Sequence, residues 1–214
     1  MSINGANYIL ACDPGLSGQF CLLDVNTLEA KFFAMPTEKR AYSYRDKKAD
    51  KKKRRVYKVI DRKALKELVN RLITPRITFC VIESQQAYPA KNGKQQGIAS
   101  TARHLFSYGY LLCLLENTPV PVEQTRAASW KRKLGLCKKY KQGESLSQYQ
   151  KKCLAWEAAC TLYPELKGEL TPKSYNFDKA ESLLIAHYGL NFLGKKYGLR
   201  NDDVNYLANE PAFL

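Results

Sequence analysis

The sequence opens with short apolar segments separated by turn-forming residues. Three of these segments have the length and composition of strands, and the connections between them are only a few residues long. They are residues 7–12, 19–24 and 28–35. Short connections favour antiparallel neighbours, so this part of the chain predicts a three-stranded meander. Two later apolar segments, residues 77–82 and 120–123, predict a further buried strand and a short one.

Helix signals follow the meander. Asp61 is placed to cap a helix that ends near Leu72, and apolar residues recur along it with helical spacing. Four more helices are predicted from capping residues and apolar periodicity. They are a long helix over about residues 100–116, a helix capped by Thr125 that carries Trp130 and Lys131, a helix from the capping box Ser145–Gln148 to Tyr163, and a late helix that begins near Asp178.

A run of positive charge interrupts this pattern at residues 39–58. The run holds eleven Lys or Arg side chains and two Asp, with Tyr42, Tyr44 and Tyr57 interspersed. Dense like charge is typical of a solvated segment, so we expect a mobile loop here. Aromatic side chains among basic ones also suit contact with nucleic-acid phosphates and bases.

Acidic residues stand where buried segments end. Asp13 ends the first apolar segment just before a Pro-Gly turn, and Glu83 ends the segment 77–82. Asp178 and Glu181 are three residues apart, so on a helix they project from one face. Four carboxylates can therefore converge at the rim of a sheet, where a metal ion would keep them ionised.

Each of these acids also has an ordinary structural explanation. An Asp before Pro-Gly forms turns, a Glu at a strand end is often solvated, and acids in a first helical turn interact with the helix dipole. The joint pattern favours chemistry because the rest of the chain is strongly basic. Lys and Arg number 35 against 20 Asp and Glu, which gives a net charge of +15 and implies a polyanionic partner.

The cysteines, the histidines and the hydropathy of the chain bear on disulfides, metal sites and membrane spans. The seven cysteines contain no C-x-x-C pair and lie mostly in apolar segments such as those of Cys12, Cys21, Cys80 and Cys113, which predicts reduced core thiols. Two histidines leave little for a histidine-based metal site. No apolar run reaches the ~18 residues of a membrane span, and no signal-peptide layout is present. We expect a cytoplasmic protein with no membrane partner, associated with the nucleoid or, if phage-encoded, in the host cytoplasm.

The order of the predicted elements, with acids on the first strand, the fourth strand and a late helix, is that of the ribonuclease H-like architecture. This α/β fold has a mixed five-stranded sheet flanked by helices. We expect one nuclease domain over residues 1–189, with the basic insertion at 39–58, and a C-terminal extension over residues 190–214.

Four stretches of the chain resemble the RuvC-like Holliday-junction resolvases, most closely the branch of plastid and phage enzymes. They are residues 13–18, 81–95, 130–164 and 178–186. Two features depart from the family. Many relatives have His-Asp where this chain has Phe177 and Asp178, and several have Asp in place of Glu181, so the resemblance leaves open which acid of that pair binds metal directly. The basic insertion is also longer than the family pattern.

The resemblance implies an endonuclease that resolves four-way DNA junctions with two divalent ions, Mg²⁺ or Mn²⁺, held about 4 Å apart. Asp13, Glu83, Asp178 and Glu181 would be the ligands. Lys152 would neutralise charge on the attacked phosphate, with the adjacent Lys151 as an alternative. Paired cuts imply a C₂ homodimer, for which the helix over residues 100–116 is a candidate interface unless its leucines pack in the core. The residues expected to contact DNA are Lys52, Lys53, Arg54, Arg55, Lys91, Lys94, Gln95, Gln96, Lys131 and Lys151.

Two rival functions remain open at this point, and a third does not fit the chain. A ribonuclease H-like nuclease that acts on another branched DNA or on RNA–DNA hybrids would use the same acids. A junction-binding protein of this fold that has lost catalysis is a second rival, although all four acids are present. An actin-like phosphotransferase shares the pattern Asp-x-Gly-x-Ser at residues 13–17, but the chain has neither a duplicated domain nor a second glycine-rich loop. We expect Trp130 to pack in the core.

Overall fold

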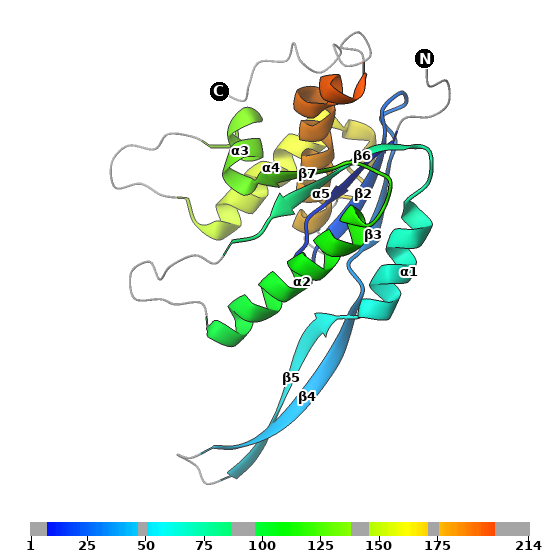
Figure 1. The fold of residues 1–214 in the computed structure, drawn as a ribbon. Coiled ribbons are helices and arrows are strands. Elements are labelled where there is room, and N and C mark those ends of the chain that lie inside the picture. The colour runs from blue at the N-terminus through cyan, green and yellow to red at the C-terminus, as the bar shows by residue number, and fades with distance from the viewer. Residues whose placement is uncertain (1–7, 47–50, 87–96, 138–145, 171–175, 200–214) are drawn as a thin grey trace.

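A mixed five-stranded sheet forms the centre of the molecule in a computed structural model that describes residues 8–46, 51–86, 97–137, 146–170 and 176–199 (Figure 1). The strands are β1 (Tyr8–Cys12), β2 (Gln19–Asp24), β3 (Ala30–Ala34), β6 (Ile77–Ser84) and β7 (Val122–Arg126). Their order in the sheet is β3-β2-β1-β6-β7. The β1-β2-β3 part is the predicted antiparallel meander, and β6 and β7 run parallel to β1. The predicted mixed five-stranded α/β fold is confirmed.

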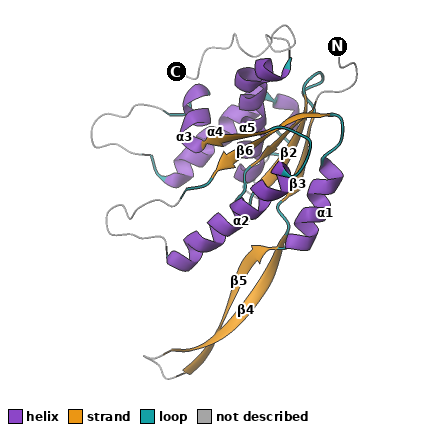
Figure 2. Cartoon of the chain, viewed as in Figure 1, coloured by secondary structure: helices purple, strands orange, loops and turns teal. Residues whose placement is uncertain are grey.

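Helices cover both faces of this sheet (Figure 2). They are α1 (Arg62–Leu72), α2 (Ile98–Glu116), α3 (Ala127–Lys133), α4 (Gln148–Leu162) and α5 (Phe177–Tyr188). Two boundary predictions were wrong. The capping box is formed by Ser147 and Gln150 instead of Ser145 and Gln148, and α3 is preceded by Arg126 instead of Thr125 as its N-cap. Both errors are shifts of one or two residues, because more than one polar residue near each helix start can serve as a cap.

Two apolar layers result from the alternation of side chains along the strands. On β6, Phe79 and Val81 pack in the layer with α4 and α5, whereas Cys80 and Ile82 pack in the layer with α1 and α2. The same alternation holds along β1. Residues that are buried on both faces explain why these strands read as continuous apolar runs.

The basic insertion forms a long β-hairpin. Its strands are β4 (Thr37–Asp46) and β5 (Lys51–Ile60), which pair only with each other and project away from the central sheet (Figure 1). The expectation of a loop was therefore wrong. Cross-strand pairing explains why a basic segment forms strands instead of a loop. Arg40 lies opposite Tyr57 and Arg55 opposite Tyr42, so each of these two guanidinium groups has an aromatic neighbour. Water screens the remaining charge.

The two ends of this hairpin meet at the body of the domain. Thr37 pairs with Ile60, and the Asp61 N–H donates to the Pro36 carbonyl at 3.1 Å. Asp61 also caps α1 as predicted, because its carboxylate accepts a hydrogen bond from the Ala64 N–H at 3.0 Å. The chain thus leaves and re-enters the domain at one point.

Residues after α5 continue as a π-helical turn (Gly189–Leu193) and a 3₁₀ turn (Gly194–Tyr197). Leu190 and Leu199 are buried in the layer with α4 and α5. Gly189 lies so close to β6 that a Cβ atom there would stand 2.8 Å from Cγ2 of Val81. The first part of the predicted extension, residues 190–199, is therefore packed on the core, and residues 200–214 lie outside the described residues.

All seven cysteines are free thiols. Cys12, Cys21 and Cys80 are buried as expected, but Cys113 is exposed on α2. Along the described residues, no helix combines the length and apolar character that crossing a bilayer requires.

Candidate active site

The end of the central sheet gathers acidic side chains from distant parts of the sequence. Because β1 and β6 are parallel, with Cys12 beside Ile82, their carboxyl ends lie at the same edge. Asp13 follows β1 directly and Glu83 lies one residue beyond Ile82. Helix α5 packs against β1 and β2 and brings its first turns to this edge.

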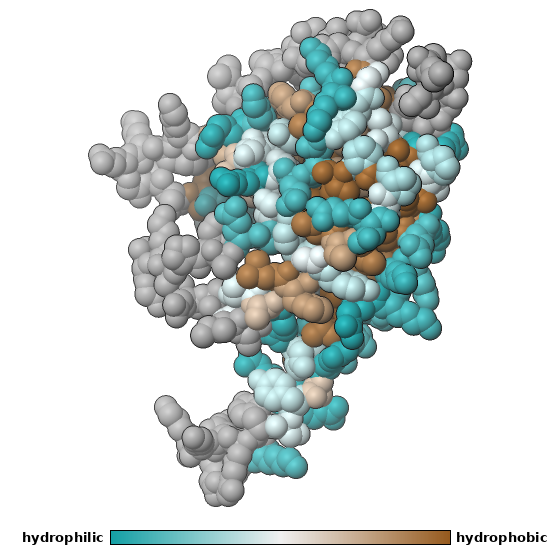
Figure 3. All heavy atoms as spheres, viewed as in Figure 1, coloured by the Kyte–Doolittle hydropathy of each residue, from teal (hydrophilic) through white to brown (hydrophobic). Residues whose placement is uncertain are grey.

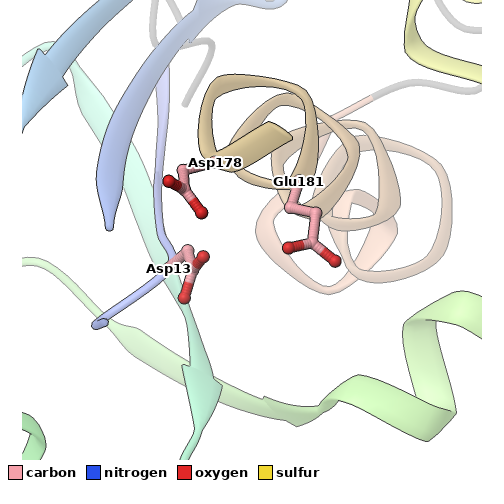
Figure 4. Close-up of side chains that lie close together, drawn as sticks. All are labelled: Asp13, Asp178 and Glu181. Carbon is pink, nitrogen blue, oxygen red and sulfur yellow. The ribbon is translucent and has the colours of Figure 1, made fainter. Parts of the chain in front are cut away.

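Asp13, Asp178 and Glu181 point toward one another (Figure 4). Each offers a carboxylate oxygen, and these oxygens all lie within 4.8 Å of one another. The turn after β1 holds Asp13 in place: Gly18 donates to the Gly15 carbonyl at 2.8 Å, and a Cβ on Gly18 would stand 1.9 Å from the Asp13 carbonyl oxygen. Position 18 therefore requires glycine, because any side chain would displace the residue that carries the carboxylate.

Glu83 lies beside this group and is held by a tryptophan. Trp130 is fully buried, as expected for a core residue, and its indole N–H donates to Glu83 Oε2 at 2.7 Å. The sequence did not predict this contact, because the two residues are 47 positions apart and a tryptophan near the start of a helix is usually explained by packing alone. This hydrogen bond holds one oxygen of the Glu83 carboxylate in place.

The electrostatics of the site favour a cation. Burial, and then the nearby charges of Glu83, Glu181 and Asp178, raise the pKa of Asp13 to about 7. Burial also raises the pKa of Glu83, although the Trp130 hydrogen bond and the Lys131 charge oppose this shift. Carboxylates that repel one another are stabilised in the ionised form by a divalent ion, and hard oxygen ligands suit Mg²⁺ or Mn²⁺. The donor set therefore fits the metals that the resemblance implies.

Two lysines lie at the rim of the acidic group. Lys131 Nζ stands 2.6 Å from Glu181 Oε1, and although burial acts in the opposite direction, Glu181 and the other acids raise the pKa of Lys131. Lys131 therefore remains charged beside the acids, and its expected contact with DNA stays a prediction. Lys152 Nζ is 3.6 Å from Asp178 Oδ1, and its side chain is 43% exposed. Its neighbour Lys151 is exposed and has no ion pair among the described residues.

The other residues expected to contact DNA fall into two groups. Lys52, Lys53, Arg54 and Arg55 belong to β5, and the side chains of Lys52, Arg54 and Arg55 are exposed. Lys91, Lys94, Gln95 and Gln96 lie outside the described residues. The hairpin leaves the sheet at the same edge as the acids. Strand β3, which precedes the hairpin, ends at Ala34 opposite Gln19. The Gln19 carbonyl in turn accepts a hydrogen bond from the Asp13 N–H at 3.1 Å.

No family model matches the chain, and no curated protein matches it. The chain is similar to a solved structure of Thermus thermophilus RuvC, with 14% identity over 90% of this chain and 97% of that one and a TM-score of 0.43. At that score the likeness carries no argument, and the fold rests on the strand order and helix placement given above.

Proposed function

We propose that the protein is a metal-dependent DNA endonuclease that resolves four-way junctions. The observation that carries this proposal is the convergence of Asp13, Asp178 and Glu181 at the end of the sheet, with Glu83 beside them, in a chain of net charge +15. An acidic centre repels a polyanion unless cations lie between them. A basic protein with such a centre therefore suits metal-assisted chemistry on nucleic acid.

Each side chain has a role in this proposal. Asp13, Glu83, Asp178 and Glu181 would hold two divalent ions, and the chemistry that such ions supply when bound is activation of the attacking water and neutralisation of negative charge at the phosphate. Trp130 fixes the orientation of Glu83 through its indole N–H. Lys131 and Lys152 lie at the rim, where an ammonium group can bind a phosphate oxygen as it gains charge.

Branched DNA is the proposed substrate because the basic hairpin projects from the edge that carries the acids. A hairpin that extends beyond the body can contact a second arm while one strand lies at the acids. Symmetric cuts in a junction require two sites, which a homodimer supplies. The core-packing alternative holds for Leu111 and Leu115 of α2, which are buried within the domain, so these two leucines are not part of the proposed interface.

The proposal is tested by incubating the purified protein with a synthetic four-way junction, a linear duplex, a flap and an RNA–DNA hybrid, with Mg²⁺ and with Mn²⁺. We expect paired, symmetric nicks in the junction and little cutting of the duplex. Preferential cutting of the hybrid would instead support a ribonuclease H activity on the same acids. Junction binding with no cleavage under either metal would support the non-catalytic alternative.

A further inference from the structure

The two faces of the basic hairpin differ in chemistry. Because side chains alternate along a strand, Arg40 and Tyr42 of β4 share one face with the opposing Tyr57 and Arg55 of β5. Tyr42 and Tyr57 meet edge to face, with ring centroids 5.7 Å apart. The opposite face carries Lys39, Ala41, Val56, Lys58, Lys52 and Arg54. One face is therefore mixed aromatic and guanidinium, and the other carries basic, small and aliphatic residues without an aromatic one.

The aromatic face forms one wall of a pocket. The pocket has a volume of about 630 Å³ and lies between the hairpin, the N-terminal half of α2 and the start of α1. Four arginines line it: Arg40, Arg55, Arg62 and Arg103. Arg40 is paired with Glu38 at 2.6 Å, whereas the other three form no ion pair within the described part of the chain. No acidic residue is among the described lining residues, so the pocket is strongly positive.

Three aromatic side chains also line the pocket, and two of them are exposed. Phe106 of α2 is 58% exposed, and Tyr42 is 46% exposed. The Arg103 guanidinium lies 5.0 Å from the centroid of the Tyr57 ring, which fixes one arginine against the pocket wall. The space-filling view shows hydrophobic side chains exposed over α2 near the start of the hairpin, with hydrophilic ones around them (Figure 3). Apolar side chains that gather at the surface inside a polar rim are typical of a binding site.

We infer that this pocket binds an unstacked nucleobase of the DNA, with its rings against Tyr42 and Phe106 and its flanking phosphates on the arginines. Bases that leave the stack are held by aromatic rings, and guanidinium groups bind the adjacent phosphates. Junction centres offer such bases, and linear duplex does not. The inference rests on the proposed function for the identity of the polymer, and it extends that function by assigning a subsite away from the acids.

A second copy of this chain is the competing occupant. Each copy has only 20 acidic side chains against 35 basic ones, so a second copy has few carboxylates to place against Arg55, Arg62 and Arg103. A nucleotide supplies the negative charge that the pocket lacks. The position of the pocket also suits DNA, because the hairpin base and the end of β1 lie at one edge of the sheet.

The test uses 2-aminopurine, a base analogue whose fluorescence falls when it stacks on an aromatic ring. It is placed in a single-stranded 12-mer and, separately, at the exchange point of a four-way junction, and each is titrated with protein in the absence of divalent metal. We expect quenching with the wild type. Tyr42→Leu and Phe106→Leu should each abolish the quenching and weaken binding of the 12-mer at least about fivefold.

Arg55→Gln and Arg54→Gln form a matched pair, since they remove the same charge from neighbouring positions on opposite faces. We expect Arg55→Gln to reduce the quenching reached at saturating protein, whereas Arg54→Gln should weaken binding only slightly and reach the wild-type quenching at saturation. Quenching that persists in both Tyr42→Leu and Phe106→Leu would overturn the inference. A second result would also overturn it. If light scattering shows that the wild type is a dimer and Phe106→Leu a monomer, while the quenching is unchanged, this face joins two copies of the chain.

Cleavage is measured separately with Mg²⁺, so failure of the subsite and failure of the proposed function give different results. Junction cleavage without pocket-dependent quenching overturns the subsite alone. Pocket-dependent quenching without cleavage of any substrate supports the subsite and overturns the nuclease proposal.

Discussion

The acidic edge of the sheet and the basic hairpin hold charge in opposite ways. At the edge, Asp13, Glu83, Asp178 and Glu181 are partly buried, so their charges act on one another and on Lys131. On the hairpin, the described charged side chains are exposed, and Arg40 and Arg55 lie opposite Tyr57 and Tyr42 across the strands. The energy of a buried charge depends on the position of every atom nearby. Exposed charges act on a DNA partner mainly through their total number. Single substitutions should therefore have large effects at the edge and small ones on the hairpin.

The largest effect is expected from Asp13→Asn. Loss of one carboxylate from the acidic group should lower the cleavage rate at least about 1,000-fold, because metal ions supply several kcal/mol of transition-state stabilisation. Junction affinity should stay within about twofold of wild type or rise, since negative charge is removed. Asp24→Asn is the matched control, because Asp24 ends β2 at the opposite end of the sheet. Full activity of Asp13→Asn after rigorous purification would remove the metal-site assignment.

The next effect needs several substitutions at once. Replacing Lys51, Lys52, Lys53, Arg54 and Arg55 with Gln should weaken binding to all DNA by about 100-fold at 0.1 M salt, and each lost phosphate contact should reduce the slope of log K against log salt by about 0.9. The cleavage rate at saturating protein should change little. The control is the double variant Lys63→Gln and Lys66→Gln on the exposed side of α1. It shows how much binding is lost when positive charge is removed away from the hairpin. An unchanged salt slope in the hairpin variant would mean that the hairpin makes no phosphate contacts.

Asp13→Asn should also stabilise the metal-free protein, by up to about 4 kcal/mol at pH 8. The pKa of Asp13 is raised to about 7, so the folded state binds this proton more tightly than the unfolded state does. Burial of the ionised group is therefore unfavourable above pH 7, and the penalty disappears as the pH falls from 7 toward 4. Urea unfolding of both proteins at pH 8 and pH 4.5 measures the difference. A stability difference that is the same at both pH values would contradict the raised pKa.

The smallest effect is expected from Trp130→Phe, which keeps the ring in the core and removes the donor to Glu83. Partners that orient metal ligands contribute to affinity, so we expect the Mg²⁺ concentration for half-maximal cleavage to rise about tenfold. Trp156→Phe is the control, because Trp156 donates to the Leu170 carbonyl away from the acids. Equal Mg²⁺ requirements in the two variants would assign Trp130 to packing alone.

The sequence predicted the central sheet because its strands are apolar on both faces and bounded by clear turns. It also indicated Asp13, Glu83, Asp178 and Glu181 as candidates, because a carboxylate at the end of a buried strand is conspicuous. The hairpin was missed for the converse reason. Its residues alternate between faces, but both faces contain basic side chains, so the alternation of Arg40 and Tyr42 is hidden within a run of like charge.

Contacts between distant residues were beyond the sequence. Trp130 and Lys131 are adjacent, yet the first holds Glu83 and the second pairs with Glu181, since successive residues near a helix start project in different directions. Nothing in the local sequence specifies which acid each would meet. The pocket between the hairpin and α2 likewise depends on how two elements pack, and α2 carries Arg103 and Phe106 some 50 residues after the hairpin.

The hydrogen bond between Pro36 and Asp61 has a consequence for how such proteins can diversify. Since the hairpin begins and ends at one point, its length could change, or another segment could replace it, without moving β1, β6 or α5. The residues for cleavage, on the sheet, and the residues for substrate preference, on the hairpin, could then change independently in evolution. A chimaera that exchanges residues 38–59 for a short turn, and keeps the Thr37–Ile60 pair and the buried Ile60 side chain, should fold with its acidic edge intact.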